Sequence, residues 1–185
     1  IGRAIALDFA RNGANVALMA LEKEELEETV REVEKFGVKG LSIPVDLSNL
    51  EKLKEAVDSF FNTFEHCEIL VNNAGMSHYS TVVDYPLDKA KMLFDVNLFA
   101  YYAMVKLVLP DMIKQGRGNI LMTASVHGNM FFLPKKVAYS TTKAGVTAMG
   151  KSLHNELKPH GIRVNVILPG AIDTKLVQDN VARGQ

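Results

Sequence analysis

The chain has 185 residues, enough for one globular domain with a substantial apolar core. Apolar residues make up 48% and charged residues 23%, and the 21 basic residues equal the 21 acidic ones. A chain without net charge has no overall field to attract nucleic acid, so we expect no nucleic-acid partner. The single cysteine, Cys67, excludes an internal disulfide and indicates a reducing compartment.

The most apolar stretch, residues 92–110, contains Asp95, Asn97 and Lys106. We therefore expect no membrane-spanning helix. The chain begins at Ile1 with neither an initiator methionine nor a signal-like segment. A cytoplasmic protein is the expectation, and an upstream targeting signal stays open.

Helical patterns and short apolar runs alternate along the chain, which carries no repeat and no linker. In chain order we expect a helix at 3–11, a strand at 15–20, a helix at 23–36, a strand at 40–46, a helix at 50–64, a strand at 68–72, a helix at 87–114, a strand at 119–124, a helix at 139–158 and a strand at 163–168. The apolar runs do not alternate with polar residues, which is typical of strands buried on both faces. The order predicts one domain, residues 1–185, with a doubly wound parallel sheet between two helix layers: a three-layer, Rossmann-like α/β fold.

Several residues mark the expected helix ends. Ser48 with Glu51 three residues later predicts a capping box at the start of the third helix. Gly37 and Gly116 are expected to end their helices. Pro110 should bend the long helix or end it early.

In such folds, ligands bind beyond the carboxyl ends of the strands. Ala20 ends the first strand where an acidic residue would bind the ribose hydroxyls of NAD, so its presence favours NADP. Ala20 could equally be no more than the end of a buried strand. Lys23 could contact a 2′-phosphate or be simply solvated. Asp46, after the second strand, is either a turn former or a partner for the adenine amino group.

The next strand ends carry small and polar residues. Residues 72–75, Asn-Asn-Ala-Gly, either form a sharp turn or bring bare backbone close to a ligand. Ser125 could polarise a substrate carbonyl or cap a turn. Pro169 and Gly170 end the fifth strand, and Thr174 could bind a carboxamide such as that of nicotinamide.

Tyr139 and Lys143 are four residues apart, so they share one face of a helix. A free phenol, with a pKa of about 10, is a poor acid–base group near neutrality. A neighbouring ammonium stabilises the phenolate and lowers that pKa. The pair therefore suits proton transfer.

The chain resembles the classical short-chain dehydrogenases/reductases over essentially its whole length, and 3-oxoacyl-acyl-carrier-protein reductases among them. The resemblance rests on features that occur in the family's order: Asp46, the run 72–75, Asn97 within Asp95-Val96-Asn97, Ser125, Tyr139-x-x-x-Lys143, and Pro169-Gly170 with Thr174.

The resemblance implies a role for each catalytic residue. Tyr139 would exchange a proton with the substrate oxygen, and Lys143 would lower the pKa of Tyr139 and hold the nicotinamide ribose. Ser125 would orient the substrate oxygen. Asn97 would bend its helix and fix a water that relays protons to Lys143.

The resemblance also implies a nicotinamide cofactor, and Ala20 favours NADP(H) over NAD(H). No metal is expected, because the histidines show no metal-ligand spacing with cysteine or carboxylates. Its expected contacts are Gly2, Asp46, Leu47, Asn72, Ala74, Gly75, Tyr139, Lys143, Pro169, Gly170, Ile172 and Thr174.

Three departures from the family pattern are visible. The family's first strand and its glycine-rich turn would precede Gly2, and its last strand would follow Gln185. We therefore expect residues 1–185 to be a fragment, since an interior strand would otherwise be lacking. The spacing from Ser125 to Tyr139 is one residue longer than expected, so the loop 126–138 should bulge.

The expected function is reduction of a carbonyl or oxidation of an alcohol, with a 3-oxoacyl thioester as the first substrate to consider. A steroid, sugar or xenobiotic carbonyl is the alternative. A non-catalytic dinucleotide sensor and a purely structural subunit are the other classes. The complete catalytic set argues against the sensor, and a lack of cofactor binding would favour the structural subunit. The apolar loop 130–133 would contact a bulky substrate or a partner subunit. Small residues Gly145, Ala148 and Gly150 suggest a homodimer or homotetramer.

Overall fold

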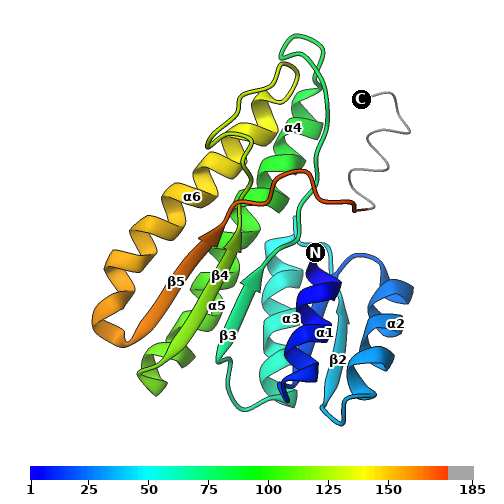
Figure 1. Cartoon of the computed structure of the whole chain (residues 1–185), viewed down its shortest axis with the longest axis vertical. Helices are drawn as coiled ribbons and strands as arrows, with labels where there is room; N and C mark the ends of the chain where they lie inside the picture. Colours follow the sequence, from blue (N-terminus) through cyan, green and yellow to red (C-terminus); the bar gives the residue numbers. More distant parts are fainter. Residues whose placement is uncertain (175–185) are drawn as a thin grey trace. The chain divides into compact units, whose positions relative to one another are not determined.

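A computed structural model describes residues 1–174 of the chain. The chain divides into two compact units, Ile1–Glu65 and His66–Gln185, which are described separately (Figure 1). The single domain expected from the sequence stays a prediction.

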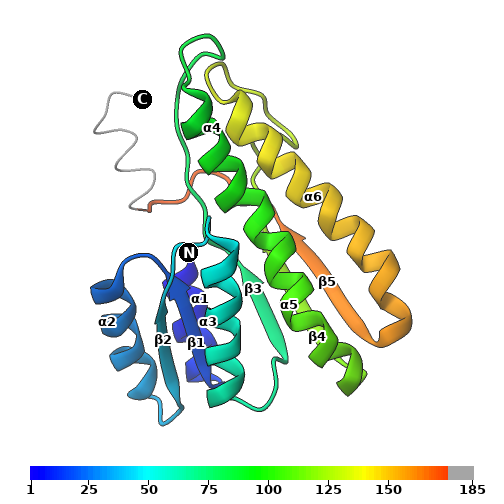
Figure 2. The same cartoon turned by 180° about the vertical axis from the view of Figure 1, so that it is seen from behind.

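The first unit contains the predicted elements in the predicted order. They are α1 (Gly2–Arg11), β1 (Val16–Ala20), α2 (Lys23–Glu34), β2 (Gly40–Pro44) and α3 (Leu50–Thr63). The two strands pair in parallel, with Val16 opposite Gly40 and Ala20 opposite Pro44. Helices α1 and α2 lie on one face of this pair and α3 on the other (Figures 1 and 2).

Apolar clusters on the two faces explain this arrangement. On one face, Ala6, Ala10 and Val33 are buried against side chains from β1. On the other, Ile43 packs with Ala56 of α3. Both faces of the strands are thus covered, which is why the strand sequences show no apolar–polar alternation.

The expected capping box at Ser48 is wrong. Asn49 is the N-cap of α3, and its Oδ1 accepts a hydrogen bond from the Lys52 backbone N–H at 3.1 Å. Ser48 instead donates its hydroxyl to Asp46 Oδ1 at 2.7 Å. Asparagine is as good a cap as serine, so the helix begins one residue later than the capping-box pattern suggested.

The second unit contains a parallel sheet of order β3-β4-β5. Its elements are β3 (Ile69–Asn72), α4 (Leu87–Phe94), the π-helix η1 (Asp95–Phe99), α5 (Ala100–Gln115), β4 (Gly118–Thr123), α6 (Val137–Leu157), the 3₁₀ turn η2 (Lys158–His160) and β5 (Ile162–Ile167). Figures 1 and 2 show α5 and α6 side by side on the same face of this sheet. The described strands therefore form two parallel sheets, β1-β2 in the first unit and β3-β4-β5 in the second.

Helices α4, η1 and α5 follow one another without a break. Pro110 does not end the helix early, because α5 continues to Gln115 and is capped by Gly116 with φ of +66°. The alternative, that Pro110 bends the helix, stays a prediction. Pro110 and Lys106 are both exposed, so water can satisfy the Lys106 carbonyl that proline leaves without a helical partner. The disruption expected around Asn97 is present as the π-helical turn η1.

The continuous helix Leu87–Gln115 is long and apolar enough to cross a membrane by length and composition. Asp95, Asn97 and Lys106 therefore do not by themselves exclude a membrane span, contrary to the expectation from the sequence. Core helices of globular proteins pass the same test, and Leu93, Tyr101 and Met112 are buried in this unit. Its position against the sheet is that of a core helix.

The small residues of α6 mostly face inward. A Cβ at Gly145 would lie 3.1 Å from Leu98, and one at Gly150 would lie 2.2 Å from Val166. These two glycines therefore let α6 pack closely inside its own unit, and they give no support to an interface between subunits.

Candidate active site

Strand β4 and helix α6 place a serine and a tyrosine together. Ser125 follows β4 and is buried, and its Oγ accepts a hydrogen bond from the His127 backbone N–H at 3.1 Å. Burial raises the pKa of Tyr139 above its ordinary value, and the side-chain hydrogen bond with Ser125 partly opposes that rise. Because Ser125 Oγ accepts the hydrogen bond from the His127 N–H with one lone pair, its own hydroxyl hydrogen is available for donation to another acceptor.

Lys143 is one turn beyond Tyr139 on α6. Its Nζ donates to the Thr123 carbonyl at 2.8 Å and lies 6.0 Å from the centre of the Tyr139 ring. Burial lowers the pKa of Lys143 to about 8. Since the pKa of Tyr139 is raised, Lys143 loses its proton before Tyr139 ionises. In this arrangement the expected lowering of the Tyr139 pKa by Lys143 is therefore not found.

Asn97 lies at the centre of the π-helical turn and is fully buried. Its Oδ1 accepts from the Met76 N–H at 2.8 Å, and its Nδ2 donates to the Met76 carbonyl at 2.9 Å and to Thr142 Oγ1 at 3.2 Å. A Cβ at Gly75 would lie 3.3 Å from Asn97 Oδ1 and 3.4 Å from Lys143 Nζ. The structure thus brings Asn97 and Lys143 to the backbone that follows β3.

Tyr101 also belongs to this network, although the sequence analysis did not identify it. Its side chain is buried, and its hydroxyl donates to the Ala74 carbonyl at 2.9 Å. Burial raises the pKa of Tyr101. Its position four residues after Asn97, on the same helix face, was a signal that could have found it.

The loop after Ser125 folds back tightly. The N–H of Gly128 donates to the Phe131 carbonyl at 2.8 Å, and Asn129 Nδ2 donates to the Ser125 carbonyl at 2.8 Å. The bulge that the longer spacing predicted in this loop stays a prediction. Asn129, which the sequence analysis also missed, therefore fixes the backbone of Ser125.

A second buried lysine lies near Tyr139. Lys136 is the N-cap residue of α6 and is 4% exposed. Its Nζ donates to Ser77 Oγ and lies 3.4 Å from the ring centre of Tyr79 and 5.1 Å from that of Tyr139. Burial lowers the pKa of Lys136 to about 8. In the sequence, only its position one helical turn before Tyr139 indicated that Lys136 lies near the site.

Other expected cofactor contacts follow β3 and β5. The Nδ2 of Asn72 is buried and has no hydrogen-bond partner within residues 1–174, which fits a bound group that presents an acceptor. Pro169 and Gly170 follow β5, where the Pro169 carbonyl accepts from the Val126 N–H at 3.1 Å. Ile172 has a 45% exposed side chain, and Thr174 is the last residue described.

The remaining expected contacts belong to the first unit. Gly2 is the first residue of α1, and Leu47 packs against the apolar cluster around Ile43. Asp46 Oδ1 accepts hydrogen bonds from the Ser48 N–H and hydroxyl, which lower the pKa of Asp46. Asp46 thus forms a turn, which is one of the two roles that the sequence left open for it.

The two residues considered for cofactor choice have ordinary surroundings. Ala20 is the last residue of β1. Lys23 forms an exposed ion pair with Glu27 at 3.7 Å. An exposed ion pair of this kind contributes little energy, so the ammonium of Lys23 remains largely solvated. This is the second of the two roles that the sequence left open for Lys23.

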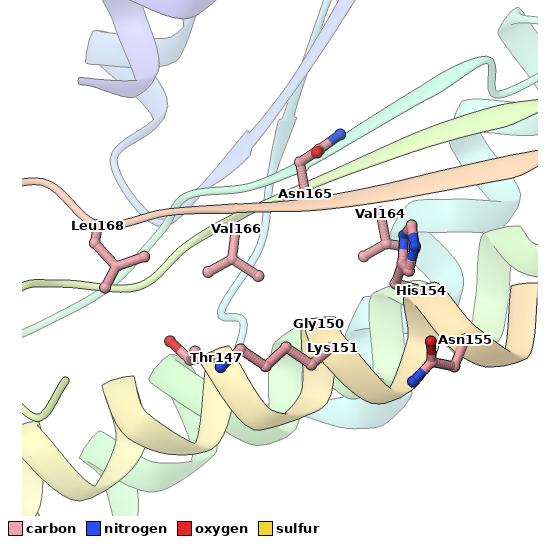
Figure 3. A pocket seen from close by; sticks show the side chains of 9 residues that line it. All are labelled: Thr147, Gly150, Lys151, His154, Asn155, Val164, Asn165, Val166 and Leu168. Carbon is pink, nitrogen blue, oxygen red and sulfur yellow. The ribbon is translucent and has the colours of Figure 1, made fainter. Parts of the chain in front are cut away.

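A groove of about 480 Å³ lies between α6 and β5 (Figure 3). It is lined by Thr147, Gly150, Lys151, His154, Asn155, Val164, Asn165, Val166 and Leu168, and contains none of the predicted site residues. Over residues 1–174 there is also no group of three His, Cys, Asp or Glu side chains that could hold a metal ion.

The family model described as short chain dehydrogenase matches residues 1–184. This chain belongs to the short-chain dehydrogenase family. It is 36% identical over 182 residues to the uncharacterized oxidoreductase YxjF of Bacillus subtilis, covering 98% of the chain and 70% of that protein. It is 33% identical over 178 residues to the 3-oxoacyl-acyl-carrier-protein reductase FabG of Thermotoga maritima, covering 96% of the chain and 72% of that protein.

Solved structures of short-chain dehydrogenases confirm the Rossmann-like fold. One from Mycobacterium marinum superposes with a TM-score of 0.91 at 31% identity, over 98% of this chain and 72% of its own. An NAD⁺-bound xylitol dehydrogenase gives 0.89 at 33%, over 95% and 68%. A metagenomic short-chain oxidoreductase in complex with NADP gives 0.87 at 30%, over 92% and 77%. The chain is an NAD(P)-dependent dehydrogenase/reductase by family.

Proposed function

We propose that this short-chain dehydrogenase interconverts a carbonyl and an alcohol, with Tyr139 as the residue that transfers the proton. The supporting observation is that the buried ammonium of Lys143 lies 6.0 Å from the centre of the Tyr139 ring, with Ser125 buried at the end of the neighbouring strand. A donor hydroxyl, a phenol and a cation at one strand end suit an oxygen that gains negative charge during reaction.

When bound, the cofactor supplies or accepts the hydride. In the reducing direction, Ser125 donates a hydrogen bond to the carbonyl oxygen, and Tyr139 gives that oxygen its proton as the carbon gains the hydride. In the oxidising direction, Tyr139 takes the proton from the alcohol as the phenolate, after its own proton has left through Lys143. Lys143 is proposed to hold the nicotinamide ribose and to return the proton to Tyr139.

Asn97 is proposed to hold the water that supplies Lys143. Its side-chain amide is already engaged with Met76 and Thr142. We therefore assign the water to its backbone carbonyl, since a π-helical turn interrupts the regular helical pairing of carbonyls. The side chain's role is then to hold this turn in place.

We propose NADP(H) as the preferred cofactor, because Ala20 offers no carboxylate to repel a 2′-phosphate. Asp46 and Leu47 are proposed to contact the adenine. The other proposed contacts are Gly2, Asn72, Ala74, Gly75, Tyr139, Lys143, Pro169, Gly170, Ile172 and Thr174. The partnerless amide nitrogen of Asn72 supports its part in this set.

A 3-oxoacyl compound is the proposed substrate, supported by the 33% identity to a 3-oxoacyl-acyl-carrier-protein reductase. The test is to assay the protein with a panel of 3-oxoacyl thioesters, steroid, sugar and aromatic carbonyls, following loss of NADPH and then NADH. Cofactor binding without turnover on every compound would overturn the proposal and favour a dinucleotide sensor.

We also propose a homodimer or homotetramer in the cytoplasm. Exposed apolar side chains recur along the continuous helix α4–η1–α5, at Met92, Phe99, Tyr102 and Ile113. A row of this kind on one helix is typical of a surface that a second subunit covers. The free Cys67 supports a reducing compartment.

A further inference from the structure

The surroundings of Lys136 lack a negative charge. In the part of the chain that the structure describes, its Nζ has a hydroxyl partner, Ser77, and two aromatic faces, Tyr79 and Tyr139. No carboxylate forms an ion pair with it there. An ammonium has three donors, and one hydroxyl engages only one of them.

A buried charge without an opposite charge is uncommon, because burial removes the water that stabilises it. The lowered pKa of Lys136 records that penalty. Cation–π contact with the Tyr79 ring offsets part of it. A bound anion would offset much more, since an opposite charge favours the ammonium form.

The position of Lys136 relates it to the reaction. It lies one helical turn before Tyr139, with its Nζ 5.1 Å from the centre of the reacting residue's ring. Its partners Ser77 and Tyr79 lie in the stretch 73–80, which has no helix or strand. Such segments rearrange more easily than strands, so a ligand can take the place of the Tyr79 ring.

We propose that Lys136 binds a carboxylate of the substrate, which makes the substrate a short hydroxy acid or oxo acid rather than its thioester. This inference rests on the proposed function and narrows it. In the oxidising direction the carbon gives its hydride to NAD(P)⁺ and the hydroxyl gives its proton to Tyr139, while the carboxylate is unchanged. Lys136 orients the acid through this unreactive group, so it determines specificity.

The test compares 3-hydroxybutyrate with its methyl ester and its N-acetylcysteamine thioester, in the wild type and in Lys136→Met. We expect the wild type to favour the acid in kcat/KM by at least tenfold. In Lys136→Met this preference should disappear, through a raised KM for the acid and an unchanged kcat/KM for the ester. Lys136→Arg should restore part of the preference.

Lys135→Met is the matched control, because it removes the same charge from an exposed neighbour. It should keep the acid preference. Equal losses on acid and ester in Lys136→Met would show that Lys136 only tethers the stretch 73–80, and would overturn the inference. A wild-type preference for ester or thioester would overturn it even if the variant failed to fold. Inactivity of the wild type on all these compounds and on the wider carbonyl panel would instead contradict the proposed function.

Discussion

The side-chain amide of Asn97 forms two hydrogen bonds with the backbone of Met76, one through Oδ1 and one through Nδ2. These bonds join the π-helical turn to the segment that follows β3. Gly75 lies against the same amide, since a Cβ placed on Gly75 would be 3.3 Å from Asn97 Oδ1. The turn and the strand end are therefore fixed to each other by one residue.

Replacing Asn97 with leucine should destabilise the protein strongly. Two backbone groups of Met76 lose their partners, at roughly 1–3 kcal/mol each. We expect a fall in the free energy of unfolding of at least about 2 kcal/mol, measured by urea denaturation. Thr142→Val is the control, because it leaves both Met76 groups paired and removes only the two hydrogen bonds of the Thr142 hydroxyl, with Asn97 and with the Tyr139 carbonyl. It should lose about 1 kcal/mol. Equal effects of the two variants would contradict this account.

Tyr139→Phe should abolish turnover and leave cofactor affinity nearly unchanged. The phenol is required only when the proton moves, so its loss affects the transition state more than the bound state. Acid–base groups contribute about 10²–10⁴-fold to rate. Steady-state kcat and a fluorescence titration with NADPH measure the two effects. A variant with more than about a tenth of wild-type kcat would show that another group carries the proton.

Lys143 predicts a pH dependence of stability. Its pKa falls from the ordinary 10.5 to about 8 in the folded protein. Between these values the unfolded chain holds a proton that the folded protein has released, so folding becomes more favourable as pH rises. Relative to Lys143→Met, the wild type should gain stability from pH 8 to 10.5, at about 1.4 kcal/mol per pKa unit of difference. Urea midpoints at pH 7 and 10 measure it, and a constant gap between the proteins would refute it.

Ala20→Asp should reverse the cofactor preference. A carboxylate at the end of β1 repels a 2′-phosphate and can bind the ribose hydroxyls of NADH. We expect the ratio of kcat/KM for NADPH to that for NADH to be above one in the wild type and below one in the variant. A wild type that already prefers NADH would contradict the role given to Ala20.

Phe99→Glu should weaken subunit association. Phe99 is 56% exposed on the continuous helix, within the apolar row proposed as an interface. A buried carboxylate without a partner disfavours the assembly. Light scattering should show a dimer or tetramer for the wild type and a smaller species for the variant. A monomeric wild type would rule out the proposed assembly.

The order of strands and helices could be predicted from the sequence, because buried parallel strands give uninterrupted apolar runs and glycines mark the helix ends. Asn97, Ser125, Tyr139 and Lys143 are each weak signals alone. Their predicted roles come from the resemblance, which rests on several motifs in the family's order along the chain.

The surroundings of Lys136 could not be predicted in this way. Its contacts come from Ser77 and Tyr79, about sixty residues earlier, in a stretch with no regular structure. The inward packing of Gly145 and Gly150 likewise depends on Leu98 and Val166, which only the folded chain brings close. Helix α5 tolerates Pro110 because water can reach the Lys106 carbonyl. The exposure of that carbonyl depends on the folded structure and not on the local sequence.

The π-helical turn Asp95–Phe99 also determines what a one-residue deletion would do to this helix. Such a turn contains one residue more than an α-helix needs. Deleting Val96 would restore regular helical pairing and make the isolated segment a better helix. Because the remaining residues would cover nearly the same angle, α5 would keep its rotation relative to α4. The extra residue therefore serves the local geometry around Asn97, whose amide holds Met76, and not the packing of the helices on either side.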